Sequence, residues 1–379
     1  MARSKELLNT ALMGPAAEQL EADLRERVIG QDSAIAQIVE VYQTYLAGMA
    51  SPGRPIANLL FLGPTGSGKT RLVEATAESL VGNPKSVVKI DCAEFQHSHE
   101  IAKLIGSPPG YLGHRETHPA LSQEVLNQQH TDEVKISFVL FDEIEKASDS
   151  LWKLMLGIMD KATLTLGDNR KVDFSQTIVF MTSNLGAKEM EAFLRPRLGF
   201  AGGEAERHRQ TGHVDESLAG SLSEVGMAAA RRNVPPEFIN RIDKIVTFRP
   251  LGKEELRDIL KLELRMVQQR VLKARPEKPF VFGLTAAGAD FLQKSGTDVR
   301  YGARHLKRSV EQWLVRPLSN LMASSQIQAG DVVRVDLHRD GTRLIFWREA
   351  KELSSIAMTQ WVEDPDSMVP GTRANTIAA

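Results

Sequence analysis

The sequence predicts an α/β fold: a parallel sheet with helices on both faces, followed by a smaller, mostly helical domain with a β-hairpin. Before Gly252, short and nearly continuous apolar runs alternate with amphipathic segments, as expected of strands that are buried on both faces of a parallel sheet. From Gly252 onward the pattern changes to long, charged, amphipathic helices. An alternating stretch with a turn signal at Asp340 and Gly341 then predicts the hairpin.

Five apolar runs have the length of strands. The first begins at Ala57 and leads into a glycine-rich turn and the amphipathic stretch "RLVEATAESL", and the others cover residues 86–91, 136–143, 177–184 and 244–248. Ahead of them, residues 18–46 show helical spacing that Gly30 interrupts, with Asp32 or Ser33 as the cap of the second helix. The two longest helices are predicted within residues 253–273 and 303–322.

These patterns divide the chain into four regions. They are an N-terminal helical extension (residues 1–24), a large domain (25–249), a small C-terminal lid domain (250–348) and a tail (349–379). Within the large domain, residues of about 186–233 are polar and poor in aromatic side chains. Such a stretch buries too little area to offset its ordering entropy. We therefore expect an exposed and partly mobile insertion there.

The composition is that of an ordinary globular protein, with 42% hydrophobic and 25% charged residues. The 47 basic and 48 acidic side chains nearly balance, so no overall field attracts nucleic acid or an anionic membrane. No apolar run approaches the roughly 18 residues that a membrane helix requires. Cys92 is the single cysteine, which excludes a disulfide framework and a Cys-based zinc site. We expect a cytoplasmic protein that binds neither nucleic acid nor membrane.

A phosphate-binding loop is the clearest chemical motif. The segment "GPTGSGKT" follows a predicted strand and precedes a predicted helix, and it comprises Gly63, Pro64, Thr65, Gly66, Ser67, Gly68, Lys69 and Thr70. Glycines allow backbone N–H groups to close around phosphate oxygens, and the helix N-terminus adds positive potential. Lys69 would reach the β- and γ-phosphates, and Thr70 would ligate Mg²⁺. A chance glycine-rich turn would not carry every fixed position of this motif.

Two adjacent carboxylates end the strand "FVLFDE". Asp142 and Glu143 are costly to desolvate at that position. By themselves they fit a solvated turn after a core strand equally well. Beside a nucleotide, however, Asp142 would hold the Mg²⁺ shell and Glu143 would polarise the attacking water. The phosphate-binding loop in the same chain therefore favours nucleotide hydrolysis.

Seven motifs occur in an order that resembles a known family. They are "RVIGQDSAI", "FLGPTGSGKT", "PPGYLG", "VLFDEIEK", "MTSNLG", "PPEFINRID" and "RYGARHLKR". Together they resemble the second, C-terminal ATPase module of the Clp/Hsp100 unfoldases, in the AAA+ superfamily. The resemblance covers roughly residues 25–335. It implies ATP and Mg²⁺ as cofactors, ATP hydrolysis to ADP and phosphate, and a homo-oligomer that is a hexamer.

The resemblance also implies roles for residues outside the loop. Asn184 would be sensor 1, which orients the lytic water, although a polar residue in this place could instead cap its strand. Arg241 would be the arginine finger of a neighbouring subunit's site. Arg304 would be sensor 2, although a basic helix face could also be solvated or bind nucleic acid. Val28 and Ile29 resemble the adenine-contacting segment, which an ordinary helix junction would also resemble.

Two further segments bear on partners. In "PPGYLG", Tyr111 resembles the pore-loop tyrosine with which these unfoldases grip an extended polypeptide, and the alternative is a ring that packs on its own domain. Leu198, Gly199 and Phe200 resemble the tripeptide with which some members dock onto the ClpP peptidase, and the alternative is an anchor for the insertion. The motifs thus indicate a protein unfoldase or remodeller that threads its substrate through a central pore.

A different class of function stays open. An ATP-controlled assembly or scaffold protein needs Lys69, Glu143 and Arg241 but no pore-loop grip. We also expect no first ATPase module, globular N-terminal domain or coiled-coil insertion, which are the parts that usually recruit substrates in the larger relatives. Substrate selection is therefore not explained by the sequence.

Overall fold

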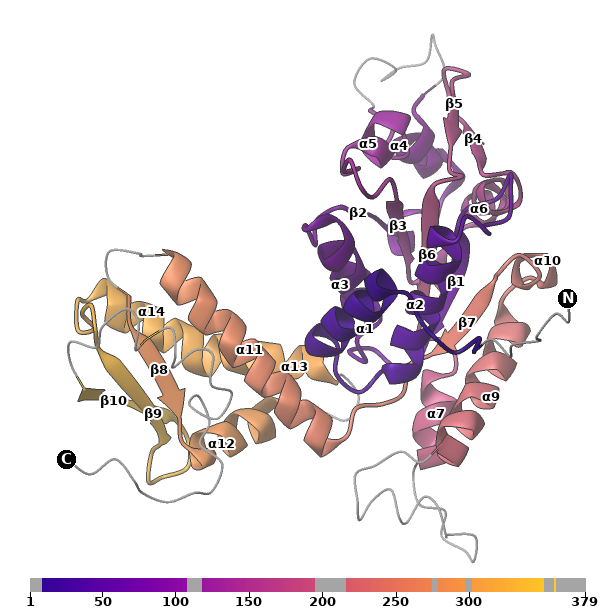
Figure 1. Ribbon diagram of the computed structural model, residues 1–379. Helices are drawn as coiled ribbons and strands as arrows, with labels where there is room; N and C mark the ends of the chain where they lie inside the picture. The colour runs from indigo at the N-terminus through magenta and orange to yellow at the C-terminus, as the bar shows by residue number, and fades with distance from the viewer. Residues whose placement is uncertain are drawn as a thin grey trace, which may run out of the picture. The chain divides into compact units, whose positions relative to one another are not determined.

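The computed structural model describes residues 9–107, 118–194, 216–274, 279–296, 302–350 and 358. They form two compact units (Figure 1). Most of the chain up to Arg249 belongs to the first unit, and most of the second unit lies from Pro250 onward, although Thr65–Ser67 are also grouped with the second unit. In the described part of the chain, no helix has both the length and the apolar character needed to span a bilayer.

The first unit is built on a five-stranded sheet with the order β2-β3-β6-β1-β7. All four strand pairings are parallel. The strands are β1 (Ala57–Leu62), β2 (Val87–Asp91), β3 (Ser137–Asp142), β6 (Thr177–Ser183) and β7 (Lys244–Thr247). Every residue of β1 and β6 is buried, which is why these strands read as continuous apolar runs. The predicted parallel α/β sheet is confirmed.

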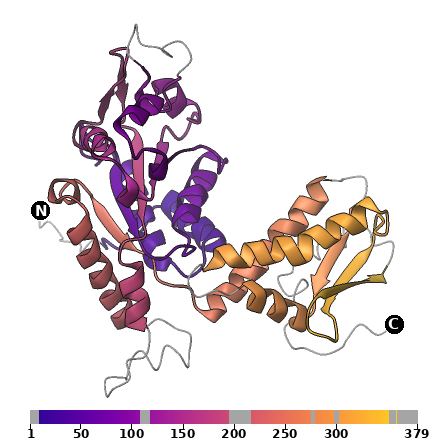
Figure 2. The ribbon, with the colours of Figure 1, turned by 180° about the vertical axis from the view of Figure 1, so that it is seen from behind.

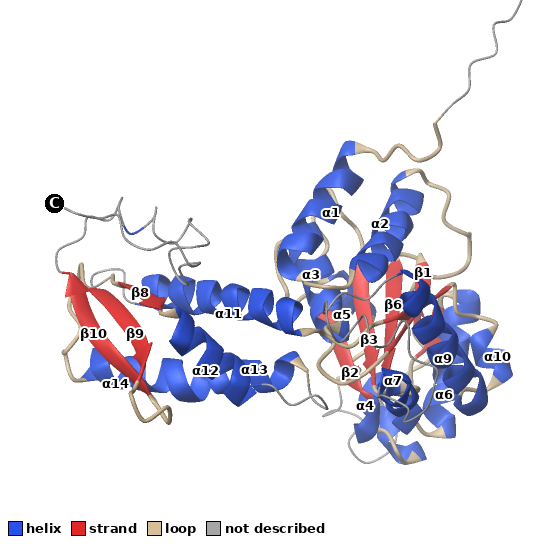
Figure 3. Ribbon diagram, turned by 90° about the horizontal axis from the view of Figure 1, so that it is seen from below, coloured by secondary structure: helices blue, strands red, loops and turns tan. Residues whose placement is uncertain are grey.

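Helices cover both faces of this sheet (Figure 3). Along β1, Leu59 and Phe61 belong to one hydrophobic core, and Leu60 and Leu62 belong to another. The first core is completed by α1 (Pro15–Arg27), α2 (Asp32–Leu46) and α3 (Lys69–Val81). The second is completed by α4 (Ala102–Ile105), α5 (Gln123–Asn127), α6 (Asp149–Lys161) and α10 (Pro236–Ile239). The alternation of side chains along β1 thus creates two cores, one on each face.

Helix α1 is part of the first unit. Its buried side chains Ala17, Leu20 and Leu24 lie in the same core as α2 and the sheet. The boundary that the sequence suggested at residue 24 therefore falls inside this helix. Gly30, with φ of 74°, separates α1 from α2 as expected, but the N-cap of α2 is Gln31 rather than Asp32 or Ser33.

Several short elements were not predicted. The strands β4 (Thr163–Thr165) and β5 (Lys171–Asp173) form an antiparallel hairpin in which Leu164 faces Val172. Three-residue strands give too little alternation for a sequence pattern to reveal them. The 3₁₀ turns η1 (Cys92–Glu94), η2 (Ser98–Ile101) and η3 (Ile144–Lys146) complete the connections of the sheet.

The described parts of the polar segment predicted at residues 186–233 include α7 (Ala187–Leu194) and α9 (Glu216–Asn233). Met190 of α7 and Leu222 of α9 are buried together, and Ala230 reaches the main core. A few apolar residues at helical spacing are thus sufficient to attach both helices to the first unit. The residues between them, 195–215, lie outside the described part of the chain.

The second unit is mostly helical, with a three-stranded sheet of order β10-β9-β8 (Figure 2). Its helices are α11 (Lys253–Ala274), α12 (Ala286–Gly296), α13 (Ala303–Val310), the π-helical segment η4 (Glu311–Val315) and α14 (Arg316–Ala323). Its strands are β8 (Val281–Leu284), β9 (Val332–Leu337) and β10 (Leu344–Ala350). The predicted hairpin is confirmed as the antiparallel pair β9–β10, whereas β8, parallel to β9, was not predicted.

Met358, in the predicted tail, packs on this second unit. It is 3% exposed and forms a small buried cluster with Val281 of β8 and Val332 of β9. The weak sequence pattern around Met358 did not predict this packing.

Candidate active site

The glycine-rich loop connects the end of β1 to the start of α3, and its backbone requires glycine. Gly63 has φ of 141°, and a Cβ atom there would lie 2.4 Å from the carbonyl oxygen of Phe248. Gly68 has φ of 104° and precedes the first residue of α3, and a Cβ atom there would meet nothing within 4 Å. The loop therefore packs tightly at its beginning and leaves open space at the helix N-terminus. This arrangement suits a phosphate group, which binds backbone N–H groups at a helix start.

Lys69 is held inside this loop. The residue is 8% exposed. Its Nζ donates to the carbonyl oxygens of Gly63 at 2.7 Å and Pro64 at 3.0 Å. Nζ also donates to Oδ1 of Asn184 at 3.0 Å. These three acceptors are neutral, so they orient the ammonium group without cancelling its charge. The loop thus presents positive potential to an anionic ligand.

The acidic pair lies at the end of β3, beside β6. Thr182 of β6 donates its hydroxyl proton to Asp142, and the same hydroxyl oxygen accepts a hydrogen bond from the backbone N–H of Glu143 at 3.1 Å. Glu143 has φ of 57° and ψ of 52°, a left-handed conformation that costs a non-glycine residue about 1–3 kcal/mol. Glu143 consequently does not continue the alternation of β3, which ends at Asp142.

Asn184 connects the two halves of the site. Its Oδ1 accepts from Lys69, and its Nδ2 donates to Oε1 of Glu143 at 3.2 Å. The backbone N–H of Asn184 donates to Oε1 of Glu145 at 3.1 Å, so its main chain is held independently of its side chain. Lys146 donates to the other carboxylate oxygen of Glu143, and this contact raises the pKa of Lys146. The structure thus brings the predicted residues Lys69, Glu143 and Asn184 together. They lie at the carboxyl ends of β1, β3 and β6, where ligands bind in open α/β sheets.

The donor set fits Mg²⁺ that is shared with a nucleotide. Thr70 lies in the first turn of α3, and Asp142 is partly exposed at the end of β3. Within the described part of the chain, no group of three or more His, Cys, Asp or Glu side chains is arranged to hold a metal ion. Mg²⁺ in nucleotide sites usually takes one or two carboxylates and completes its shell with phosphates and waters. An oxygen donor set of this kind is therefore the appropriate chemistry.

The junction between α1 and α2 is attached to the same region. Val28 is 5% exposed and extended, and Ile29 is partly buried beside it. The side chain of Gln31 donates to the carbonyl oxygen of Arg249 at 3.0 Å and accepts from its N–H at 3.2 Å. Arg249 directly follows Phe248, the residue that contacts Gly63. The predicted adenine-contacting segment is thus connected to the glycine-rich loop through Arg249 and Phe248.

Arg241 lies at the amino ends of the strands, opposite the end that carries the glycine-rich loop. It precedes β7, so it is located at the amino end of that strand, whereas the glycine-rich loop follows the carboxyl end of β1, the parallel neighbour of β7. Its guanidinium forms an ion pair with Asp160 of α6, with 2.6 Å between Nε and Oδ1, and donates to the carbonyl oxygen of Glu237. The fold therefore separates Arg241 from Lys69 and Glu143 of its own chain.

The remaining predicted residues belong to other segments of the chain. Arg304 is exposed on α13 of the second unit. Tyr111 lies outside the described residues, as do Leu198, Gly199 and Phe200.

Three residues of the site were missed by the sequence interpretation. Thr182, Glu145 and Lys146 hold Asp142, the backbone of Asn184 and the carboxylate of Glu143, respectively. The signal for Thr182 was a polar residue inside the apolar run "TIVFMTSN", at the position that neighbours Asp142. Glu145 and Lys146 looked like ordinary solvated charges after a strand.

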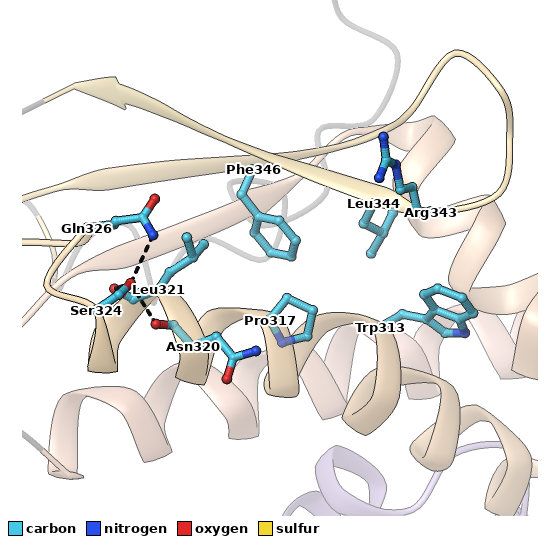
Figure 4. A pocket seen from close by; sticks show the side chains of 9 residues that line it. All are labelled: Trp313, Pro317, Asn320, Leu321, Ser324, Gln326, Arg343, Leu344 and Phe346. Atoms are coloured by element: carbon cyan, nitrogen blue, oxygen red, sulfur yellow. Dashed lines mark hydrogen bonds between the residues drawn. The ribbon is translucent and has the colours of Figure 1, made fainter.

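A separate hollow in the second unit has a different character (Figure 4). It has a volume of about 640 Å³ and is lined mainly by apolar side chains of η4, α14 and β10, including Trp313, Leu321 and Phe346. Among the described residues that line it there is no carboxylate, histidine or cysteine. The groups able to perform hydrolysis are those at the end of the parallel sheet.

Comparisons with known proteins identify the family of the chain. Residues 54–245 match the family model "AAA domain (Cdc48 subfamily)", and residues 251–335 match the model of the C-terminal, D2-small domain of ClpB protein. The chain is 36% identical to chaperone protein ClpB 1 of Thermosynechococcus vestitus over 337 residues, covering 89% of this chain and 35% of the relative. It is 37% identical to chaperone protein ClpB of Bdellovibrio bacteriovorus over 327 residues, covering 86% and 34%.

A solved structure is also similar. A closed-state cryo-EM reconstruction of Hsp104 with ATPγS and FITC-casein has a TM-score of 0.68 and 29% sequence identity, over 87% of this chain and 51% of that chain. The chain spans about a third of the length of the curated relatives it matches. Its first unit carries the AAA match and its second unit the D2-small match. The chain therefore belongs to the AAA+ ATPases, in their Clp/Hsp100 branch.

Proposed function

We propose that this chain hydrolyses ATP at the end of its parallel sheet and uses the energy to unfold or remodel proteins. The observation that supports the hydrolytic role most strongly is Asn184, which contacts Lys69 on one side and Glu143 on the other. A nucleotide with its γ-phosphate at Lys69 would therefore lie close to the carboxylate of Glu143. No other group of described residues combines a phosphate-binding loop with a positioned general base.

Each residue has a distinct task in this proposal. Lys69 would exchange its loop carbonyls for phosphate oxygens. Thr70 and Asp142 would hold Mg²⁺, which would neutralise charge that develops on the phosphates. Glu143 accepts a hydrogen bond from the attacking water. Its carboxylate is oriented by Asn184 at one oxygen and by Lys146 at the other. These two contacts fix the direction of the carboxylate.

The active enzyme is a homo-oligomer in this proposal, with six subunits in a ring. Arg241 lies at the amino ends of the strands, whereas the glycine-rich loop of its own chain lies at the carboxyl ends. We therefore propose that it contacts the nucleotide of a neighbouring subunit as an arginine finger. Such a residue supplied in trans accelerates hydrolysis by about 10³–10⁵-fold in nucleotidases where this has been measured. Arg304, on the second unit, acts as sensor 2 and couples hydrolysis to movement of that unit.

The substrate is an extended polypeptide. The relatives are named chaperone proteins, and the Hsp104 reconstruction includes casein. We propose that Tyr111 of each subunit contacts the polypeptide in the pore and that displacement of these loops pulls it through. The ring would work in the cytoplasm.

The test is steady-state ATP hydrolysis with and without an unfolded model polypeptide. The wild type should be stimulated, and Tyr111→Ala should keep its basal rate but lose the stimulation. Tyr111→Phe is the matched control: it retains the ring and should retain the response. If the polypeptide changes neither the wild type nor the variants, the threading function is wrong and the assembly or scaffold function replaces it.

A further inference from the structure

Arg54, just before β1, makes three contacts with segments that are distant in sequence. Its Nε donates to the carbonyl oxygen of Met159 at 3.4 Å, and its NH2 donates to the carbonyl oxygen of Arg241 at 3.1 Å. Its NH1 forms an ion pair with Oδ1 of Asp243 at 3.3 Å. Each nitrogen of the guanidinium is thus engaged. One planar group joins the end of α6, the turn before β7 and the start of β1.

A second residue fixes the same turn. Asn58 of β1 is fully buried, and its Nδ2 donates to the carbonyl oxygen of Arg241 at 3.2 Å. The N–H of Asn58 donates to Asp243 Oδ2 at 2.7 Å, and the N–H of Asp243 donates to the carbonyl oxygen of Asn58 at 2.9 Å. The carbonyl oxygen of Arg241 therefore accepts two hydrogen bonds from side chains that are anchored at the same strand.

The side chain of Arg241 is oriented by the same helix end. Asp160, its ion-pair partner, directly follows Met159, whose carbonyl oxygen accepts from Arg54. Arg54 thus ties the backbone of Arg241 to the turn of α6 that also holds its guanidinium. Main chain and side chain of Arg241 are fixed relative to a single point of the fold.

The ion pair of Arg54 by itself adds little stability. The side chains of Arg54 and Asp243 are 34% and 35% exposed, and ion pairs with this exposure contribute about 0–1 kcal/mol. Together with the two hydrogen bonds of Arg54, however, the ion pair restricts a position. The position that they restrict is that of a residue whose own partners in catalysis would lie on another molecule.

We propose that Arg54 is a positioning residue for ATP hydrolysis: it holds Arg241 in the direction in which it meets the nucleotide of the neighbouring subunit. This proposal rests on the function proposed above for Arg241. Lysine cannot replace Arg54, because a single ammonium nitrogen cannot span three acceptors that lie around a planar fork. Substitution of Arg54 should lower kcat and leave ATP binding nearly unchanged, since the subunit that binds the ATP keeps its own Lys69 and Glu143.

The test compares Arg54→Met, Arg54→Lys, Arg241→Ala and the double variant Arg54→Met/Arg241→Ala. Misplacing a catalytic group by about 1 Å can cost about 10²-fold in rate, so kcat of both Arg54 variants should fall between about tenfold and about a hundredfold. KM for ATP should change by less than about threefold. The double variant should be no slower than Arg241→Ala. Slower hydrolysis by the double variant would overturn the proposal, because Arg54 would then act independently of Arg241.

A matched control separates positioning from loss of fold stability. Arg348 is also 34% exposed, forms an ion pair with Asp331 at 2.9 Å and donates to the carbonyl oxygen of Gln326. Arg348→Met should lower the melting temperature yet leave kcat unchanged at 25 °C. The proposal is wrong if the loss of kcat in Arg54→Met is accounted for by loss of folded, assembled rings, and if Arg348→Met loses kcat to the same extent.

Mixed rings distinguish this proposal from the function it rests on. Subunits with Lys69→Ala bind no nucleotide but carry an intact Arg54 and Arg241, so mixing them with Arg54→Met subunits should restore hydrolysis. Mixing Arg54→Met with Arg241→Ala subunits should restore none. If Arg241→Ala alone keeps full activity in assembled rings, the trans role fails and this proposal fails with it. If Arg241→Ala is inactive but Arg54→Met is fully active, only the positioning role is overturned.

Discussion

Replacement of Asn184 by alanine tests the geometry of the site. The substitution removes the acceptor for Lys69 and the donor to Glu143 in one step. It should leave the main chain in place, since the backbone N–H of residue 184 is bound to Glu145. The expected loss is therefore one of orientation at Glu143 and Lys69, with the fold preserved.

The magnitude follows from the two hydrogen bonds. A hydrogen bond to a charged group contributes about 1.5–3 kcal/mol. Lys69 has other acceptors, the loop carbonyls in this structure and phosphate oxygens when nucleotide is bound. We therefore count the bond to Glu143 in full and the bond to Lys69 in part, about 3 kcal/mol in total. Each 1.36 kcal/mol corresponds to a tenfold change in rate. Hence kcat should fall by about 10²-fold.

The assay is steady-state ATP hydrolysis, together with equilibrium binding of a fluorescent ATP analogue. Asn184→Ala should bind the analogue but turn over slowly. Asn184→Asp should also be slow, because it keeps an acceptor for Lys69 but places a negative charge against Glu143. Asn233→Ala is the matched control: this asparagine donates only locally, to the carbonyl oxygen of Ala229 at 2.8 Å. A kcat for Asn184→Ala within about twofold of the wild type would refute the reasoning.

Three further predictions concern the first unit. Burial, and then the nearby carboxylates, raise the pKa of Cys92, so its thiol should react with a disulfide reagent only after denaturation, as absorbance of the released thiolate would show. Burial, followed by the charge of Lys135, lowers the pKa of His130. Its contribution to stability is therefore fully present above the unfolded pKa of about 6.5 and is lost as the pH falls through the folded pKa. Thermal melts from pH 7.5 to 5 should show this loss, and His130→Gln should weaken it; equal pH dependence would contradict the assignment. Gly63→Ala would place a methyl group 2.4 Å from the carbonyl oxygen of Phe248. It should destabilise the first unit by at least ~2 kcal/mol, measurable by urea unfolding, and an unchanged midpoint would contradict the packing.

The sheet could be predicted because its strands are buried on both faces. The runs that contain Phe61, Phe141 and Phe180 have no polar alternation and therefore stand out against the helices between them. The loop and the acidic pair were recognisable because their chemistry needs particular residues at fixed spacing. Both kinds of signal depend on residues that are close together in the chain.

The features that the sequence did not predict depend on contacts between residues that are far apart in the chain. Nothing local marks Glu145 as a partner of Asn184, or Arg54 as a partner of Arg241, because these pairs form only when separate segments meet. The same holds for Met190 and Leu222, whose burial places α7 and α9 on the first unit although the segment reads as polar. Composition gives the average polarity of a segment, whereas attachment to a core requires only a few apolar side chains on one helix face.

The coupling of ATP to polypeptide binding is tested most directly by a hydrolysis-deficient variant. Glu143→Gln should bind MgATP without turnover, and Lys69→Ala should bind no nucleotide. Fluorescence anisotropy of a labelled unfolded polypeptide is then measured with each variant, with and without MgATP. The account predicts that MgATP raises the anisotropy with Glu143→Gln and has no effect with Lys69→Ala. An unchanged anisotropy in assembled Glu143→Gln rings with MgATP, or equal binding by Lys69→Ala, would contradict it.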